Sequence, residues 1–228
     1  MIDPGNLLNQ FMGGNNGARP GGSPGNAGGG GRGDLMKGAA VGGILGLLVG
    51  NKKARKMAGG LVGYGGAAAA GALAFKAYQN WQQGKQAATA PVATAADVNN
   101  VDPRFLPASI DNSGQNFSLT LMTAMISAAK ADGHIDATEQ AAIFEHVDKL
   151  SLDAENKAAV FDLLRQPVNI DALVNSVKGV EQASEVYLVS RMAIDVDHPA
   201  ERAYLEALAH RLQLPAELVA HLDHQVEG

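Results

Sequence analysis

Apolar side chains recur every three or four positions from residue 117 to residue 226. This spacing places them along one face of successive α-helices, which have about 3.6 residues per turn. Seven such segments follow one another, with apolar positions at Leu119, Ile143, Val160, Ile170, Val186, Leu205 and Leu218. The alternating pattern of strands joined by hairpin turns is missing from this half of the sequence. The sequence therefore predicts an all-α bundle of about seven helices over residues 117–228.

Two short acidic segments interrupt this helical pattern. Asp132-Gly133-His134-Ile135-Asp136 precedes one predicted helix, and Asp195-Val196-Asp197-His198 precedes another that opens at Pro199. When Glu139 is aligned with Glu201, the apolar positions on either side correspond as well. The sequence therefore predicts that the bundle contains two copies of a helix–acidic loop–helix unit.

The acidic loops admit two interpretations. Convergent carboxylates are the ligands that Ca²⁺ and Mg²⁺ prefer, and the two loops together offer six of them. These candidate metal ligands are Asp132, Asp136, Glu139, Asp195, Asp197 and Glu201. Acidic residues at these positions are equally typical of helix caps and of first helical turns, where they favour the helix dipole. The spacing alone leaves both interpretations open.

Histidines give weaker candidates for a transition-metal site. His134 and His198 lie within the two acidic loops, and His221 and His224 stand three positions apart on one predicted helix face. The chain has no cysteine, which excludes thiolate metal sites, disulfides and a cysteine nucleophile. We recognise neither a nucleophile elbow nor a phosphate loop in the sequence, so we expect a protein that is not an enzyme.

The N-terminal part has a different composition. Residues 1–90 contain 24 of the 28 glycines and a formal charge of +7, whereas residues 91–228 carry a formal charge of −12. Residues 1–34 are rich in Gly and Asn and are predicted to form a disordered tail. The acidic C-terminal half and the low aromatic content of 5% argue against a nucleic-acid partner.

Residues 35–81 are predicted to form a glycine-zipper membrane region. Gly38, Gly42, Gly46 and Gly50 recur at four-residue spacing, which lets helices approach closely in lipid and favours self-association. The stretch from Met57 to Phe75 has no charge over nineteen residues, close to the ~20 that cross a bilayer. A single crossing, a helical hairpin and an interfacial helix are all compatible with this pattern. Residues 82–116, which are polar and interrupted by Pro, are expected to be a linker.

The positive charges fix the expected orientation. Lys52, Lys53, Arg55 and Lys56 precede the nineteen-residue stretch and should stay cytoplasmic, which places the C-terminal domain in the periplasm of a bacterial inner-membrane protein.

Two segments resemble known bacterial families. The segment from Met36 to Lys53, with Tyr64-Gly65-Gly66 and residues 74–81, resembles the YebE family of inner-membrane proteins of unknown function. Ala131 to Asp136 with Glu139, and the second-copy Asp195, Asp197 and Glu201, resemble the TerB-like helical domain of tellurite-resistance proteins. The second loop departs from that pattern, because His198-Pro199 stands where an Asp-Gly turn would mirror the first.

The TerB resemblance implies an all-α TerB-like fold, a divalent-cation site at the acidic loops and a role in envelope or metal-stress responses. It also places the domain in the cytoplasm, against the charge rule, so the side of the membrane stays open. We therefore expect a membrane-anchored, non-enzymatic interaction protein that contacts lipid, associates with itself and binds an unknown protein partner. The alternative is a soluble metal-sensing or metal-buffering protein.

Overall fold

The computed structural model describes Gly5, Leu8 and residues 66–106, 111, 113–114, 116–131, 154–194, 196 and 199–227. Its regular elements within these ranges are α-helices and short 3-10 helices, without a strand, which confirms the all-α prediction. The helices are α4 (Gly66–Gln82), α5 (Phe117–Ala129), α7 (Ala154–Arg165), α8 (Ile170–Ser176), α9 (Gly179–Met192), α10 (Pro199–Arg211) and α11 (Ala216–Glu227). The 3-10 helices are η4 (Ala87–Thr89), η5 (Asp97–Asn100) and η6 (Pro103–Phe105).

The sequence signals place most of these helices correctly. Pro199 is the first residue of α10, and Pro215 immediately precedes α11. Asn116 caps α5, because its side-chain oxygen accepts a hydrogen bond from the Ser118 backbone N–H at 2.9 Å. The predicted helix that would begin after Asp136 lies outside the described residues.

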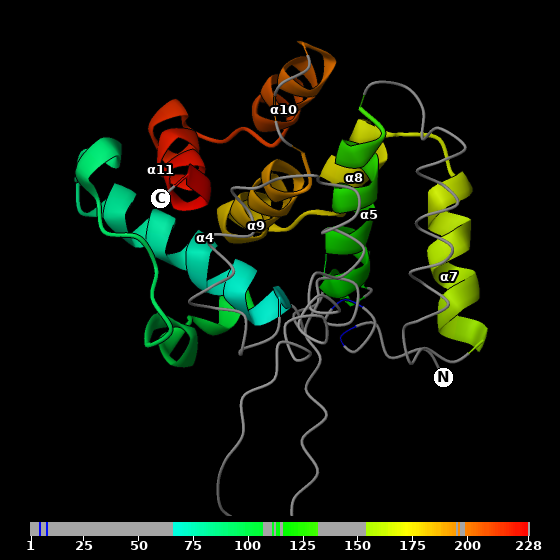
Figure 1. The fold of residues 1–228 in the computed structure, drawn as a ribbon, viewed down its shortest axis with the longest axis horizontal. Coiled ribbons are helices and arrows are strands. Elements are labelled where there is room, and N and C mark those ends of the chain that lie inside the picture. Colours follow the sequence, from blue (N-terminus) through cyan, green and yellow to red (C-terminus); the bar gives the residue numbers. More distant parts are fainter. Residues whose placement is uncertain are drawn as a thin grey trace, which may run out of the picture.

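Helix α9 occupies the centre of the bundle, in contact with α4, α5, α10 and α11 (Figure 1). Every residue from 182 to 190 is buried, so this helix is surrounded on all sides. The packing between α5 and α9 relies on large side chains, including Leu121, Met122, Met125 and Leu188. The core is therefore built around one central helix rather than between two layers.

Helix α4 is part of this core. It lies against α9 and α11 (Figure 1) and buries a face made almost wholly of small residues. Its buried residues are Ala69, Ala70, Gly71, Ala72, Leu73, Ala74, Ala77 and Asn80. Residues 66–75 form the second half of the stretch that we expected to cross a membrane. Residues 69–74 of this stretch are buried in the protein, because packing in a helical core satisfies an uncharged Ala/Gly-rich helix as well as lipid does.

None of the helices in the described ranges combines the length and apolarity that a bilayer crossing requires. The prediction of a bacterial inner-membrane protein, on either side of the membrane, is contradicted by this finding. The zipper glycines Gly38, Gly42, Gly46 and Gly50 lie outside the described residues.

Residues 83–106, which we call the strap, lead from the end of α4 and contain η4, η5 and η6. The sequence presented them as part of a linker, but they contact α4, α9 and α11. Phe105 is fully buried, and its ring lies 5.3 Å from that of Phe75 and 5.5 Å from that of Tyr78. The strap is therefore anchored to the helical core at its far end.

Candidate functional site

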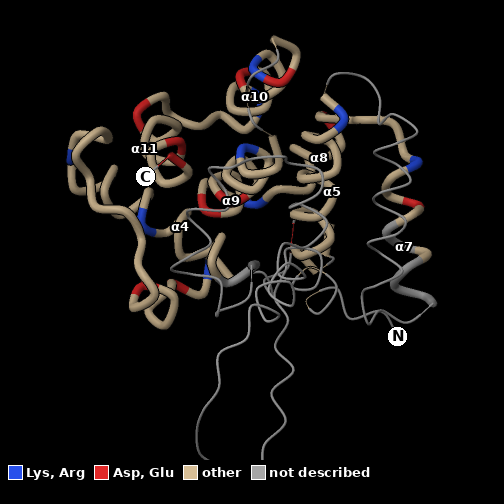
Figure 2. Tube along the Cα trace, in the orientation of Figure 1, with Lys and Arg blue, Asp and Glu red and all other residues tan. Residues whose placement is uncertain are grey.

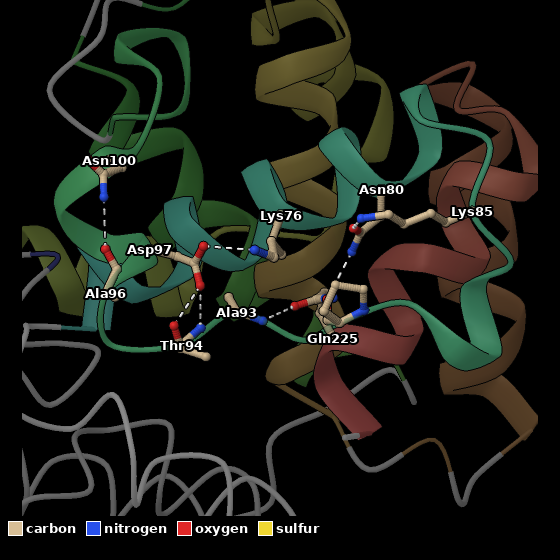
Figure 3. Close-up of polar contacts among 10 residues, drawn as sticks. Lys76, Asn80, Lys85, Ala93, Thr94, Ala96, Asp97, Asn100 and Gln225 are labelled. Carbon is tan, nitrogen blue, oxygen red and sulfur yellow. Dashed lines mark hydrogen bonds and ion pairs between the residues drawn. The ribbon is translucent and has the colours of Figure 1, made fainter.

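The strap is held by side chains of α4 and α11 that bind its backbone (Figure 3). Gln225 uses both ends of its amide: the Ala93 N–H donates to its Oε1 at 2.8 Å, and its Nε2 donates to the Pro91 carbonyl at 3.2 Å. Asn80 of α4 donates to the same Pro91 carbonyl at 2.9 Å. Because Gln225 and Asn80 are buried, losing these bonds would leave polar groups unpaired.

Ion pairs fix the remaining part of the strap. Lys76 donates to Asp97 at 2.8 Å, and Arg104 pairs with both Asp102 and Glu181 of α9. Burial acts to raise the pKa of Asp97, but hydrogen bonds from Lys76 and Thr94 outweigh it and lower the pKa. The carboxylate is therefore charged in the folded protein at neutral pH.

The histidine pair on α11 also binds the strap. His221 Nε2 lies 3.0 Å from the Lys85 carbonyl oxygen, and His224 Nε2 lies 3.0 Å from the Ala90 carbonyl oxygen. A carbonyl accepts only, so each Nε2 carries the proton and donates. The two imidazole rings therefore bind two different carbonyls of the strap. Because each Nε2 carries a proton for this bond, it is unavailable as a metal ligand.

The six predicted carboxylate ligands are mostly outside the described ranges. Asp132, Asp136, Glu139, Asp195 and Asp197 lie there, as do His134 and His198. Glu201 is described, and it sits half-buried in the first turn of α10. Within the part of the chain that the structure describes, His, Asp and Glu do not gather in threes that could hold a metal ion. The structure thus leaves the predicted ligand set without a direct test.

The structure does describe the helices that lead into both acidic loops. The Ser190 hydroxyl, in the last turn of α9, donates to the carbonyl of Ala124, near the middle of α5, at 3.4 Å. The Tyr204 hydroxyl of α10 is buried beside the hydroxyls of Ser127 and Ser190, without a hydrogen bond of regular geometry to either. Burial raises the pKa of Tyr204, so this phenol is neutral. The ends of α5 and α9 therefore meet beneath α10.

A pocket opens beside this region, between α5, α8 and the segment that joins α7 to α8. Its volume is about 210 Å³, and Thr120, Thr123 and Ser127 contribute hydroxyls to its lining. Several of its polar groups already have partners. Lys130 donates to the Leu164 carbonyl at 3.0 Å and so caps the end of α7, and Thr120 donates to Asp111 at 2.9 Å. The pocket wall is therefore held together by its own hydrogen bonds.

Glu185 is a buried polar residue that the sequence analysis missed. It is 0% exposed, and neither carboxyl oxygen has a hydrogen-bond partner among the residues that the structure describes. Burial raises the pKa of Glu185 well above its ordinary value, which favours the neutral acid. Helical periodicity could have flagged this residue, because Glu185 shares a face with Leu188 and Val189 at positions i+3 and i+4.

Fold and site together define an all-helical protein whose acidic helical domain is joined to an Ala/Gly-rich helix through an anchored strap. Residues 34–226 match the family described as a protein of unknown function, DUF533, and the chain belongs to this family. An uncharacterised protein in the ampR 5′ region of Yersinia enterocolitica is 34% identical over 98 residues, which cover 43% of this chain and 70% of that relative. No solved structure matches this chain significantly.

Proposed function

We propose that this DUF533 protein is a non-enzymatic binding protein whose two acidic loops together take a divalent cation. The observation that supports the proposal is that Tyr204 of α10 lies beside both Ser127, in the last turn of α5, and Ser190, in the last turn of α9. Asp132 follows Ser127 by five residues, and Asp195 follows Ser190 by the same number. The two loops therefore start from neighbouring helix ends, which favours convergence of their carboxylates.

Charge supports a cation as the ligand. The half of the chain that holds both loops has a formal charge of −12 over residues 91–228, and such a surplus attracts cations and repels phosphate backbones. Asp132, Asp136, Glu139, Asp195, Asp197 and Glu201 supply only oxygen ligands, which suits Ca²⁺ or Mg²⁺. We expect the bound ion to order the acidic surface for a protein partner.

The finer family resemblances agree with this proposal. The segment from Met36 to Lys53 is similar to the YebE family, and the acidic loops are similar to those of TerB-like domains. The resemblance to TerB-like domains implies a divalent-cation site and a role in metal stress. We extend both to this chain as part of the proposal, together with self-association through the glycine stripe.

Calorimetric titration of the full chain with Ca²⁺, Mg²⁺, Mn²⁺ and Zn²⁺ tests the proposal. We expect binding of at least one ion, weakened tenfold or more (about 1.4 kcal/mol) by Asp132→Asn and by Asp195→Asn. Asp162→Asn, on the exposed face of α7, is the matched control and should leave the affinity unchanged.

Three results would contradict the proposal. The first is the absence of binding heat with all four ions. The second is an ion affinity that Asp132→Asn weakens and Asp195→Asn leaves unchanged, which would exclude the second loop from the site. The third is unchanged binding in Asp136→Ala and Glu139→Ala with lowered stability, which would establish the capping interpretation for those two residues.

A further inference from the structure

Glu185 lies where α4, the strap and the central helix meet. Gly71 of α4 lies next to its carboxyl group. A β-carbon added at Gly71 would be 3.6 Å from Glu185 Oε2 and 2.3 Å from the Phe105 carbonyl oxygen. The carboxyl group therefore faces the closest approach of α4 to the strap. A buried polar group without a partner is unusual in a native protein and calls for an explanation.

The charges on the elements around α9 are engaged elsewhere. Helix α5 has no charged residue, as Figure 2 shows. Lys76 of α4 pairs with Asp97, Arg104 of η6 pairs with Asp102 and Glu181, and Arg191 of α9 pairs with Asp223 and Glu227 of α11. The remaining titratable groups on α9 and on the helices packed against it are Tyr78, Tyr187, Glu201, Arg202, Tyr204, Glu206, His210, Arg211, Glu217, His221 and His224.

Burial raises the pKa of Glu185, and among the described residues no hydrogen bond or ion pair reaches its carboxyl group. The neutral acid is tolerated in the apolar interface. A carboxylate there would be both unpaired and desolvated, which costs several kcal/mol for an ion in a protein interior.

We propose that Glu185 is a pH-dependent latch, which holds α4 on α9 while it is protonated and releases α4 when it ionises. In the step itself the carboxyl O–H bond breaks and the proton passes to hydroxide or bulk water. The carboxylate then gains solvation only if a neighbouring element moves away and admits water.

Helix α4 is the element that gives way. Its buried face consists of alanines, Gly71, Leu73 and Asn80, whereas the buried side chains of α5 include Leu121, Met122, Met125 and Ile126. Hydrophobic stabilisation grows with the apolar area removed from water, so an alanine face stabilises its interface less than a face of long side chains does. Of the two helices α4 and α5, α4 therefore gains less apolar burial from its contact with the central bundle.

Trp81 allows the latch to be tested in the full chain. It is the single tryptophan, it lies in α4, and its ring is 5.7 Å from that of Tyr78. Its fluorescence reports the environment of α4, while far-UV circular dichroism reports the whole bundle. The scan runs from about pH 5 to about pH 9.5, below the ordinary pKa of Tyr and Lys near 10.

For the wild-type chain we expect the Trp81 emission to shift to longer wavelength as the pH rises, while most of the ellipticity remains. Glu185→Gln, which is neutral and of the same shape, should remove the shift, and so should Glu185→Leu. Glu206→Gln, an exposed residue of α10, is the control and should retain it.

A flat wild-type scan overturns the latch, because Glu185 would then ionise without consequence or not at all. The same holds if Glu185→Gln keeps the transition, since another group would then be responsible. Parallel loss of ellipticity in the wild type also overturns it, because α4 would not be released separately.

Discussion

Replacing Gly71 by alanine reverses the usual effect of that substitution. In a helix whose face is open, Gly→Ala stabilises by about 1 kcal/mol, because alanine restricts the unfolded chain and favours the helix. In this structure the new β-carbon would lie 2.3 Å from the Phe105 carbonyl oxygen, against about 3.4 Å for an ordinary contact. The backbone of η6 would have to move by roughly 1.1 Å, the difference between those two values.

Moving the strap by that distance would lower the stability of the fold. The atom that would clash is a backbone oxygen, and Phe105 is held by its buried ring against Phe75 and Tyr78. Overpacking in a well-packed core costs about 1–3 kcal/mol, and a backbone clash belongs at the upper end of that range. Subtracting about 1 kcal/mol for the gain in helix propensity leaves a net destabilisation of about 2 kcal/mol.

Urea unfolding at pH 7, followed by circular dichroism and Trp81 emission, measures this difference. Gln82→Ala, on the exposed end of the same helix, is the control and should change the free energy of unfolding by less than about 0.5 kcal/mol. A Gly71→Ala variant that is more stable than the wild type would refute the close packing of α4 against the strap.

Two further predictions concern buried polar groups. Gln225→Ala should destabilise by about 1–3 kcal/mol, because it leaves the Ala93 N–H without its acceptor and removes one of the two donors to the Pro91 carbonyl. Urea unfolding measures the loss, and faster hydrogen exchange at Ala93 locates it. Burial raises the pKa of Glu185 in the folded protein above its unfolded value near 4.5. The contribution of the neutral acid to the stability of the fold is therefore complete below pH 4.5 and is lost as the pH rises toward the folded-state pKa. The wild-type urea midpoint should therefore fall as the pH rises above about 5, and Glu185→Gln should reduce that fall. Equal slopes in the two proteins would count against the burial of Glu185.

Periodicity predicted the helices of the C-terminal half because each has a recognisable apolar face. Start signals then fixed some boundaries closely, as Pro199 did for α10 and Pro215 for α11. These are local features, so a single sequence contains them. The same reasoning located the ends of α5 and α9, from which both acidic loops begin.

The assignment of α4 could not be settled in this way. An uncharged run of alanine and glycine is compatible with lipid and with a protein core alike, and the choice depends on distant partners such as α9 and α11. The strap is a similar case. Its order comes from single side chains such as Gln225, more than a hundred residues away, which bind its backbone and leave no periodic pattern.

Hydrogen exchange of the full chain at pH 5, where the latch holds α4 in place, tests most directly whether α4 belongs to the helical core when it is read by mass spectrometry. Peptides that cover residues 66–82 should show protection comparable to those covering α9, because both helices are buried in the same cluster. Exchange of residues 66–82 at the rate of an unstructured peptide, while α9 stays protected, would contradict the account.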